Sequence, residues 1–277
     1  AGLTSPNSPT NTTNPSGGDV AEGVSFDGST DWLSKNGLTG SANSKTFTMS
    51  FFVYYDGSAT THIYSQAPLA DSATNIVYLY TDGRLRIQSF NSSNVEILDV
   101  TVSLNAVVNK IKNTWISVIA SMDMSNTANR YISVNDRIQS PAWDTYINEA
   151  IVFTEDANTK VCASISGSSV LKGRLSNFFL DYTYRDLSIE ANRRLFIDAD
   201  GKPVDASGLN PILYLPMTDA STAHINSGTG GDFVQNGTLA TADRGANQDN
   251  CVMTSVGDVN EYLYKSALHG ANVKQFT

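Results

Sequence analysis

The chain has 277 residues, of which 40% are hydrophobic and 16% are charged, and its formal net charge at pH 7 is −9. This length and apolar content fit one large domain with a substantial core better than two domains. The acidic balance argues against nucleic acid and anionic membranes as partners, because binding to either draws on clustered basic residues and the longest such run is Arg193–Arg194. No apolar stretch approaches the roughly 20 residues of a membrane-spanning helix.

The first 20 residues are predicted to form an extended N-terminal arm. Residues 1–18 contain Pro6, Pro9 and Pro15 and almost no apolar side chain. Such a segment cannot bury enough surface to offset the entropy lost on ordering it. We therefore expect a neighbouring surface, from another copy or a different protein, to hold the arm, with the three prolines as partner-binding residues. The alternative is an arm that lies along its own domain.

Past the arm, apolar and polar residues alternate with a period of two. In residues 45–53, Phe47, Met49, Phe51 and Val53 alternate with polar side chains, which predicts a strand with one face on a core. Asp82-Gly83, between strand patterns at 76–80 and 85–88, predicts a hairpin turn. Further strands are expected at 115–122, 130–134 with a turn at Asn135-Asp136, 161–165, 175–181 and 211–216. Many short strands separated by Gly, Asn, Asp and Ser predict an all-β sandwich or barrel over residues 21–240.

One helix interrupts the strands. Ser188 is expected to cap a helix that runs to about residue 197, with Glu190 in its first turn, and Gly201 and Pro203 are expected to end it. From residue 241 to 277 the sequence turns polar and irregular, which predicts a C-terminal arm. Cys162 and Cys251 are expected to be reduced, partly buried thiols in a chain made in a reducing cytosol; a disulfide is the alternative.

Several stretches between residues 23 and 240 form a further pattern. They are FDGSTDWL at 26–33 before the strand at 46–53, WISVIASMD at 115–123, the tip Val134-Asn135-Asp136, GRLSNFFLD at 173–181 leading to Asn192-Arg193-Arg194, DGKPV at 200–204, PILYL at 211–215 and NSGTGGDF at 226–233. This set resembles the concanavalin A-like, laminin-G-type jelly rolls found in virion proteins of tailed phages. The stretch 173–240 is similar to phage and prophage structural proteins in particular.

The resemblance implies a jelly-roll β-sandwich and a virion component, assembled in the cytoplasm of the bacterial host. Its expected partners are other virion proteins and copies of itself, and we favour a capsid decoration or head-attached component. The alternative is a receptor-binding tail protein that recognises host surface glycans. Trp143 and Tyr146, in an expected loop after Pro141, are the aromatic candidates for glycan binding, whereas Trp32 and Trp115 are expected in the core.

Laminin-G-type domains often hold calcium with Asp side chains at one rim, so the resemblance directs attention to Asp27, Asp31, Asp56 and Asp82. Calcium needs six to eight oxygens that converge from several loops, and the sequence has no dense acidic cluster. Asp in a turn usually accepts hydrogen bonds from its own backbone instead. We therefore expect no bound metal and no cofactor.

Catalysis is not expected either. Related jelly rolls host glucanases, which need two carboxylates flanking the glycosidic bond, commonly at alternate positions of one strand. No Glu-x-Asp-x-Glu pattern occurs in this sequence. The isolated candidates are Glu149, Glu155, Asp156, His62, His224 and His269, and their spacing matches neither a zinc motif nor a nucleophile–base arrangement.

Overall fold

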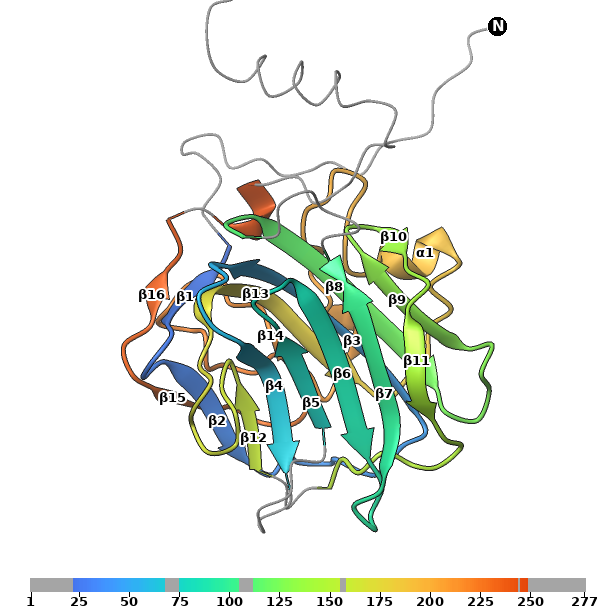
Figure 1. Cartoon of the computed structure of the whole chain (residues 1–277). Helices are drawn as coiled ribbons and strands as arrows, with labels where there is room; N and C mark the ends of the chain where they lie inside the picture. Colours follow the sequence, from blue (N-terminus) through green and yellow to red (C-terminus); the bar gives the residue numbers. More distant parts are fainter. Residues whose placement is uncertain (1–21, 68–74, 105–111, 155–157, 244, 249–277) are drawn as a thin grey trace, which may run out of the picture.

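The computed structural model describes residues 22–67, 75–104, 112–154, 158–243 and 245–248 (Figure 1). Several of the residues singled out above lie outside these ranges: Pro6, Pro9, Pro15, Glu155, Asp156, Cys251 and His269. The described strands pair into two antiparallel sheets that pack face to face. The predicted all-β jelly-roll sandwich is therefore confirmed.

Sheet A lies at the back in Figure 1 and sheet B at the front. In order across sheet A, the strands are β10 (Arg137–Ile138), β9 (Arg130–Val134), β8 (Trp115–Asp123), β3 (Thr46–Tyr55), β13 (Lys172–Asp181), β1 (Val24–Asp27) and β16 (Ala240–Thr241), with β14 (Leu213–Leu215) also paired to β13. Across sheet B they are β11 (Ala142–Tyr146), β7 (Glu96–Ser103), β6 (Arg84–Phe90), β5 (Asn75–Leu79), β4 (Thr61–Ala67), β12 (Asn158–Val161), β2 (Trp32–Asn36) and β15 (Val234–Asn236).

The main core lies between the two sheets, where the alternating residues of β3 point. Phe51 stacks on Phe178 of β13 with ring centroids 6.0 Å apart, and Phe178 stacks on Tyr64 of β4 at 5.7 Å. All three rings are buried. This aromatic stack joins sheet A to sheet B, so the packing follows directly from the period-two pattern of the strands.

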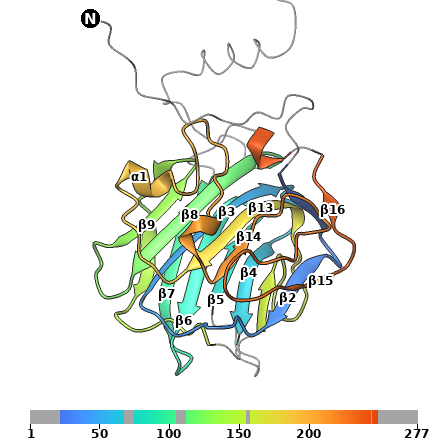
Figure 2. The same cartoon turned by 180° about the vertical axis from the view of Figure 1, so that it is seen from behind.

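The outer face of sheet A is also buried, which the predicted half-buried strand at 45–53 did not anticipate. Phe52, Trp115 and Phe179 form a second apolar cluster together with Leu187, Phe196 and Tyr214 from the segment that follows β13. That segment lies across the outside of sheet A, as Figure 2 shows. The strand and its core face were predicted correctly, but the burial of its second face was not, because the covering layer comes from residues far along the chain.

The helix is shorter than predicted. α1 spans Glu190–Arg193, and the residue at its N-cap position, Ile189, makes no side-chain cap hydrogen bond. Ser188 does not cap it, because its backbone N–H and its hydroxyl both donate to Asp186 Oδ1, at 2.9 and 2.6 Å. Among the described residues, no helix has the length and hydropathy needed to cross a bilayer.

Both predicted hairpin turns are present. Asn135 and Asp136 have φ of 47° and 61°, the left-handed values of a type I′ turn, between β9 and β10. Gly83 has φ of 82°, and its N–H donates to Tyr80 O at 2.9 Å in the turn between β5 and β6. The strand predicted at 161–165 instead ends at Val161, where Cys162 takes a left-handed φ of 69°.

Candidate functional site

The Asp side chains considered for calcium bind their own turns. Asp27 Oδ1 accepts hydrogen bonds from the N–H groups of Ser29 and Thr30 at 2.7 and 2.8 Å. Burial acts to raise the pKa of Asp27, but the hydrogen bonds from Ser29 and Thr30 outweigh it and hold this pKa well below its ordinary value. Asp31 accepts from Asp27 N–H at 3.1 Å and from Thr238 N–H at 2.9 Å, which fastens the β1–β2 turn to the turn after β15.

The other two candidates behave in the same way. Asp56 accepts from the N–H and the hydroxyl of Ser58 at 2.8 and 2.7 Å, and Asp82 accepts from Arg84 Nε at 2.8 Å. Within the described part of the chain, no three His, Cys, Asp or Glu side chains gather as a group that could hold a metal ion. Cys162 is a buried thiol whose pKa is raised well above its ordinary value by burial.

Trp143 and Tyr146 lie in edge strand β11 and not in a loop, which corrects the prediction. Trp143 pairs with core residue Val100, so its ring is on the core side of sheet B. The guanidinium of Arg130 covers both rings, at 4.7 Å from the Trp143 centroid and 5.0 Å from that of Tyr146. The Tyr146 hydroxyl donates to Asp123 O at 2.8 Å. These aromatic side chains close one side of the sandwich and are not presented to a ligand.

The outer face of sheet B carries the aromatic and polar side chains that a ligand could contact. Its central row places His62, Tyr78, Arg86 and Thr101 on adjacent strands β4, β5, β6 and β7. The ring centroids of His62 and Tyr78 lie 4.5 Å apart, and Tyr78 stacks on Tyr80 at 5.9 Å. Burial lowers the pKa of His62 to about 4, so its imidazole is neutral at pH 7.

Two carboxylates lie on this same face, and the sequence reasoning missed them. Glu96 and Asp99 are three residues apart on β7, a spacing that strict alternation would put on opposite faces. An irregularity in register between Ser89 and Phe90 of β6 brings both to the outer face. Arg86 donates from Nε and Nη2 to the two Asp99 oxygens, both at 2.7 Å, and its Nη2 lies 3.8 Å from Glu96 Oε2.

This carboxylate pair has the features of a structural ion cluster. A glycoside hydrolase holds the scissile sugar bond between its two carboxylates. Here the guanidinium of Arg86 occupies that position, and Thr145 Oγ1 donates to Glu96 Oε1 at 3.0 Å. The other catalytic candidates are not brought to this place: Glu149 accepts a hydrogen bond from Asn91, and the carbonyl of His224 accepts from Phe233 N–H at 2.9 Å.

A second group of side chains lies at the β2–β12 end of the outer face. Trp32, expected in the core, is only half-buried, whereas Trp115 is buried as expected. Lys160 Nζ lies 5.2 Å from the centroid of the Trp32 ring, and burial lowers the pKa of Lys160. The loop after β12 approaches both residues at Gly167, where a Cβ atom would lie 3.4 Å from Lys160 Nζ and 3.5 Å from Trp32 Cζ2. We call Trp32, Lys160 and the loop 164–169 the Trp32 corner.

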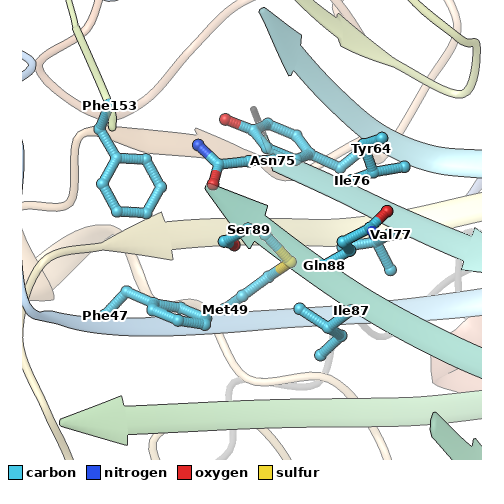
Figure 3. Close-up of a pocket in the computed structure, with 10 residues that line it drawn as sticks. All are labelled: Phe47, Met49, Tyr64, Asn75, Ile76, Val77, Ile87, Gln88, Ser89 and Phe153. Atoms are coloured by element: carbon cyan, nitrogen blue, oxygen red, sulfur yellow. The ribbon is translucent and has the colours of Figure 1, made fainter. Parts of the chain in front are cut away.

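Two hollows occur elsewhere in the molecule. A cavity of about 10 Å³ lies between the sheets beside Phe47, Met49 and Tyr64 (Figure 3), which is room for one water molecule at most. A shallow polar groove of about 300 Å³ lies by the covering layer of sheet A, with Asp205, Ser207 and Tyr214 in its wall. The Tyr214 hydroxyl there donates to Asn177 Oδ1 at 2.7 Å, so it already has a partner within the protein.

No protein-family model and no curated protein sequence matches the chain. Among solved structures, it is similar to a putative carbohydrate-binding protein from Bacteroides ovatus ATCC 8483, at 15% identity and a TM-score of 0.54, over 83% of this chain and 62% of that one. A SAP-like pentraxin from Limulus polyphemus is similar at 12% identity and a TM-score of 0.44, over 62% of this chain and 81% of that one. Domains LG4-5 of the mouse laminin alpha1 chain are similar at 16% identity and a TM-score of 0.44, over 61% of this chain and 43% of that one. At such identities the likeness concerns the fold alone, a jelly-roll β-sandwich.

Proposed function

We propose that this chain is a non-catalytic structural component of a tailed-phage virion. In this proposal it is a capsid decoration or head-attached protein that binds neighbouring virion proteins and copies of itself. It reaches the particle during assembly in the cytoplasm of the bacterial host. The proposal rests first on the resemblance of residues 173–240 to phage structural proteins.

One observation on the fold supports it in particular. Several residues that carry the resemblance are far apart in sequence and yet contact one another. Asp136, at the tip of the β9–β10 hairpin, accepts hydrogen bonds from Arg193 and Arg194 at 2.6 and 2.8 Å. Asn226 Oδ1 accepts from Tyr214 N–H at 2.8 Å, which joins the stretches 211–215 and 226–233. Tertiary contacts therefore link separate stretches of the resemblance.

Labelling of intact particles tests the proposal. Antibodies raised against the recombinant chain, coupled to gold, should decorate particles of the phage that encodes it at regular positions on the head. A variant that lacks residues 1–18 should fold normally and fail to join the particle, because the composition of that arm suits docking on a neighbour. Particles that carry no label and yield no peptide of this chain by mass spectrometry would contradict the proposal.

Glycan recognition by a tail protein is the second candidate. It is favoured by the outer face of sheet B, where half-buried aromatic rings lie among hydrogen-bonding side chains, an arrangement that suits the apolar and polar faces of a sugar ring. The similar Bacteroides structure is described as that of a putative carbohydrate-binding protein. A glycan array with the purified protein tests this candidate, and binding that survives in a Tyr78→Ala, Trp32→Ala double variant would count against this face.

A further inference from the structure

We propose that the Trp32 corner is a binding site for an acidic saccharide, a sugar that carries a carboxylate. This inference rests on the second proposed function, glycan recognition, and specifies where on the molecule the sugar binds and what charge it bears. It is argued from three features of the corner: an unpaired cation, an aromatic ring and a cluster of hydroxyl groups.

The cation is Lys160. Two other cations of sheet B, Arg84 and Arg86 of β6, form ion pairs with Asp82 and Asp99. Among the described residues, no carboxylate forms an ion pair with Lys160, although the chain carries 27 Asp and Glu against 18 Lys and Arg. The side chain is half-buried, and burial lowers its pKa, so the ammonium has lost part of its hydration without gaining an anion from the described part of the chain. A ligand carboxylate would provide that missing partner.

The aromatic ring is that of Trp32, which β2 places beside Lys160 of β12. Ser34 of β2 pairs with Lys160, so the two strands hold the ring and the ammonium on one face of the sheet. The ammonium lies 5.2 Å from the ring centroid. An indole ring packs against the C–H face of a pyranose, and an adjacent cation then meets a carboxylate on the edge of the same sugar.

The hydroxyl cluster belongs to the loop 164–169. The hydroxyls of Ser164, Ser166 and Ser168 lie 2.9 to 3.0 Å from one another, and Ser166 and Ser168 are exposed. Gly167, with φ of +77°, brings this loop against the ring and the ammonium. Hydroxyl groups that both donate and accept suit the hydroxyls of a sugar. The ammonium, the indole ring and the serine hydroxyls therefore match the carboxylate, the C–H face and the hydroxyl groups of an acidic sugar.

The three tryptophans of the chain provide the test. Trigalacturonate and sialyllactose, each beside its methyl ester, would be titrated into the ¹⁵N-labelled protein while the indole N–H signals are followed by NMR. We expect the Trp32 signal to shift saturably with the acids and the signal of buried Trp115 to stay in place. The methyl esters should bind about tenfold more weakly, because each loses a charge-assisted hydrogen bond.

Two lysine variants separate a specific site from a general charge effect. Lys160→Met should weaken binding of the acids about tenfold. Lys45→Met, which removes the same charge from a lysine that binds Asn148 elsewhere on the surface, should leave binding unchanged. Equal affinity for acid and ester, or saturable binding without a shift at Trp32, would overturn this inference and leave glycan recognition standing. The failure of both acids to bind would overturn the inference too, whereas only a glycan array without any bound saccharide would remove the second proposed function.

Discussion

Arg193 of helix α1 donates a hydrogen bond from Nε to Asp136 Oδ1 at the tip of the β9–β10 hairpin, over a distance of 2.6 Å. The adjacent Arg194 donates to the second oxygen of the same carboxylate at 2.8 Å. Asp136 thereby anchors the layer that covers the outer face of sheet A to the edge of the sheet. The Asp136 and Arg193 side chains are 12% and 13% exposed, so this ion pair is far better shielded from water than a surface pair.

We therefore expect Asp136→Asn to destabilise the protein by about 2 kcal/mol, because two guanidinium groups lose their anionic partner in a partly buried place. Asn tolerates the left-handed backbone of this position, so the change isolates the charge. Urea unfolding followed by tryptophan fluorescence gives the free energy of unfolding. Asp82→Asn is the matched control, because the Asp82–Arg84 pair is exposed to solvent and should contribute far less to stability. Equal effects of the two substitutions would contradict the anchoring role.

The residues of this anchor show what the sequence could and could not predict. The Asn135-Asp136 turn was predicted because a type I′ hairpin depends on residues at the turn itself. The cluster of Phe52, Trp115 and Phe179 was not predicted, since its cover comes from residues far along the chain. The charged helix residues were readable as a motif, but their pairing with Asp136 depends on tertiary packing.

The candidate site was less predictable than the fold, for two physical reasons. Glu96 and Asp99 share a face only because of an irregularity in strand register, which no alternation pattern reveals. Trp32 and Trp143 are both half-buried, but Trp32 lies on the outer face of sheet B and Trp143 on its core side, the reverse of what their neighbours in sequence suggested. Side-chain exposure at a sheet edge depends on what crosses it, and here a single arginine, Arg130, covers Trp143.

His62 should make stability depend on pH. Its folded pKa of about 4 lies below the ordinary histidine value of 6.5, so the unfolded state binds a proton first as the pH falls. The contribution of the neutral imidazole is complete above pH 6.5 and is lost progressively towards pH 4. We expect His62→Gln to flatten the stability curve in this window, as measured by urea unfolding at several pH values. A curve that keeps its full slope in the variant would show that other groups cause the dependence.

Gly237 should tolerate no side chain. Its φ is +76°, and a Cβ atom there would lie 2.1 Å from Asp31 Oδ1 and 2.5 Å from Thr30 O. Gly40 has the same φ of +76° and nothing within 4 Å of its Cβ position, so it is a matched control. We expect Gly40→Ala to cost about 1 kcal/mol for the left-handed backbone alone, and Gly237→Ala to lower the melting temperature clearly further. Similar losses would mean that the turn relaxes at little cost.

Chelation should leave the isolated protein unchanged. Each Asp considered for calcium accepts hydrogen bonds from groups of the protein itself, as Asp27 does from Ser29 and Thr30. A metal ion bound tightly to the folded state alone would add several kcal/mol at concentrations far above its Kd. We expect the same melting temperature in EDTA and in millimolar calcium. A drop of many degrees in EDTA that calcium reverses would show that backbone carbonyls assemble a site with these side chains.

Trp143 should be needed for stability and not for glycan binding. Its ring lies on the core side of β11, and Arg130 and Tyr146 enclose it, with the Tyr146 centroid 5.6 Å away. Trp143→Ala removes this packing, and because the ring is half-buried we expect a loss of about 2 kcal/mol, below the range for fully buried aromatic residues. The loss would be measured by thermal and urea unfolding.

The same variant, assayed below its melting temperature, should bind any saccharide found on a glycan array with unchanged affinity, because Trp143 lies on the opposite side of the sheet from Tyr78 and Trp32. Trp32→Ala is the matched comparison, with weakened binding and a smaller loss of stability expected, because its ring lies on the outer face of sheet B and does not pack against the core. A folded Trp143→Ala protein that no longer binds the saccharide would place the glycan at the β11 edge and would reverse the roles of these two tryptophans.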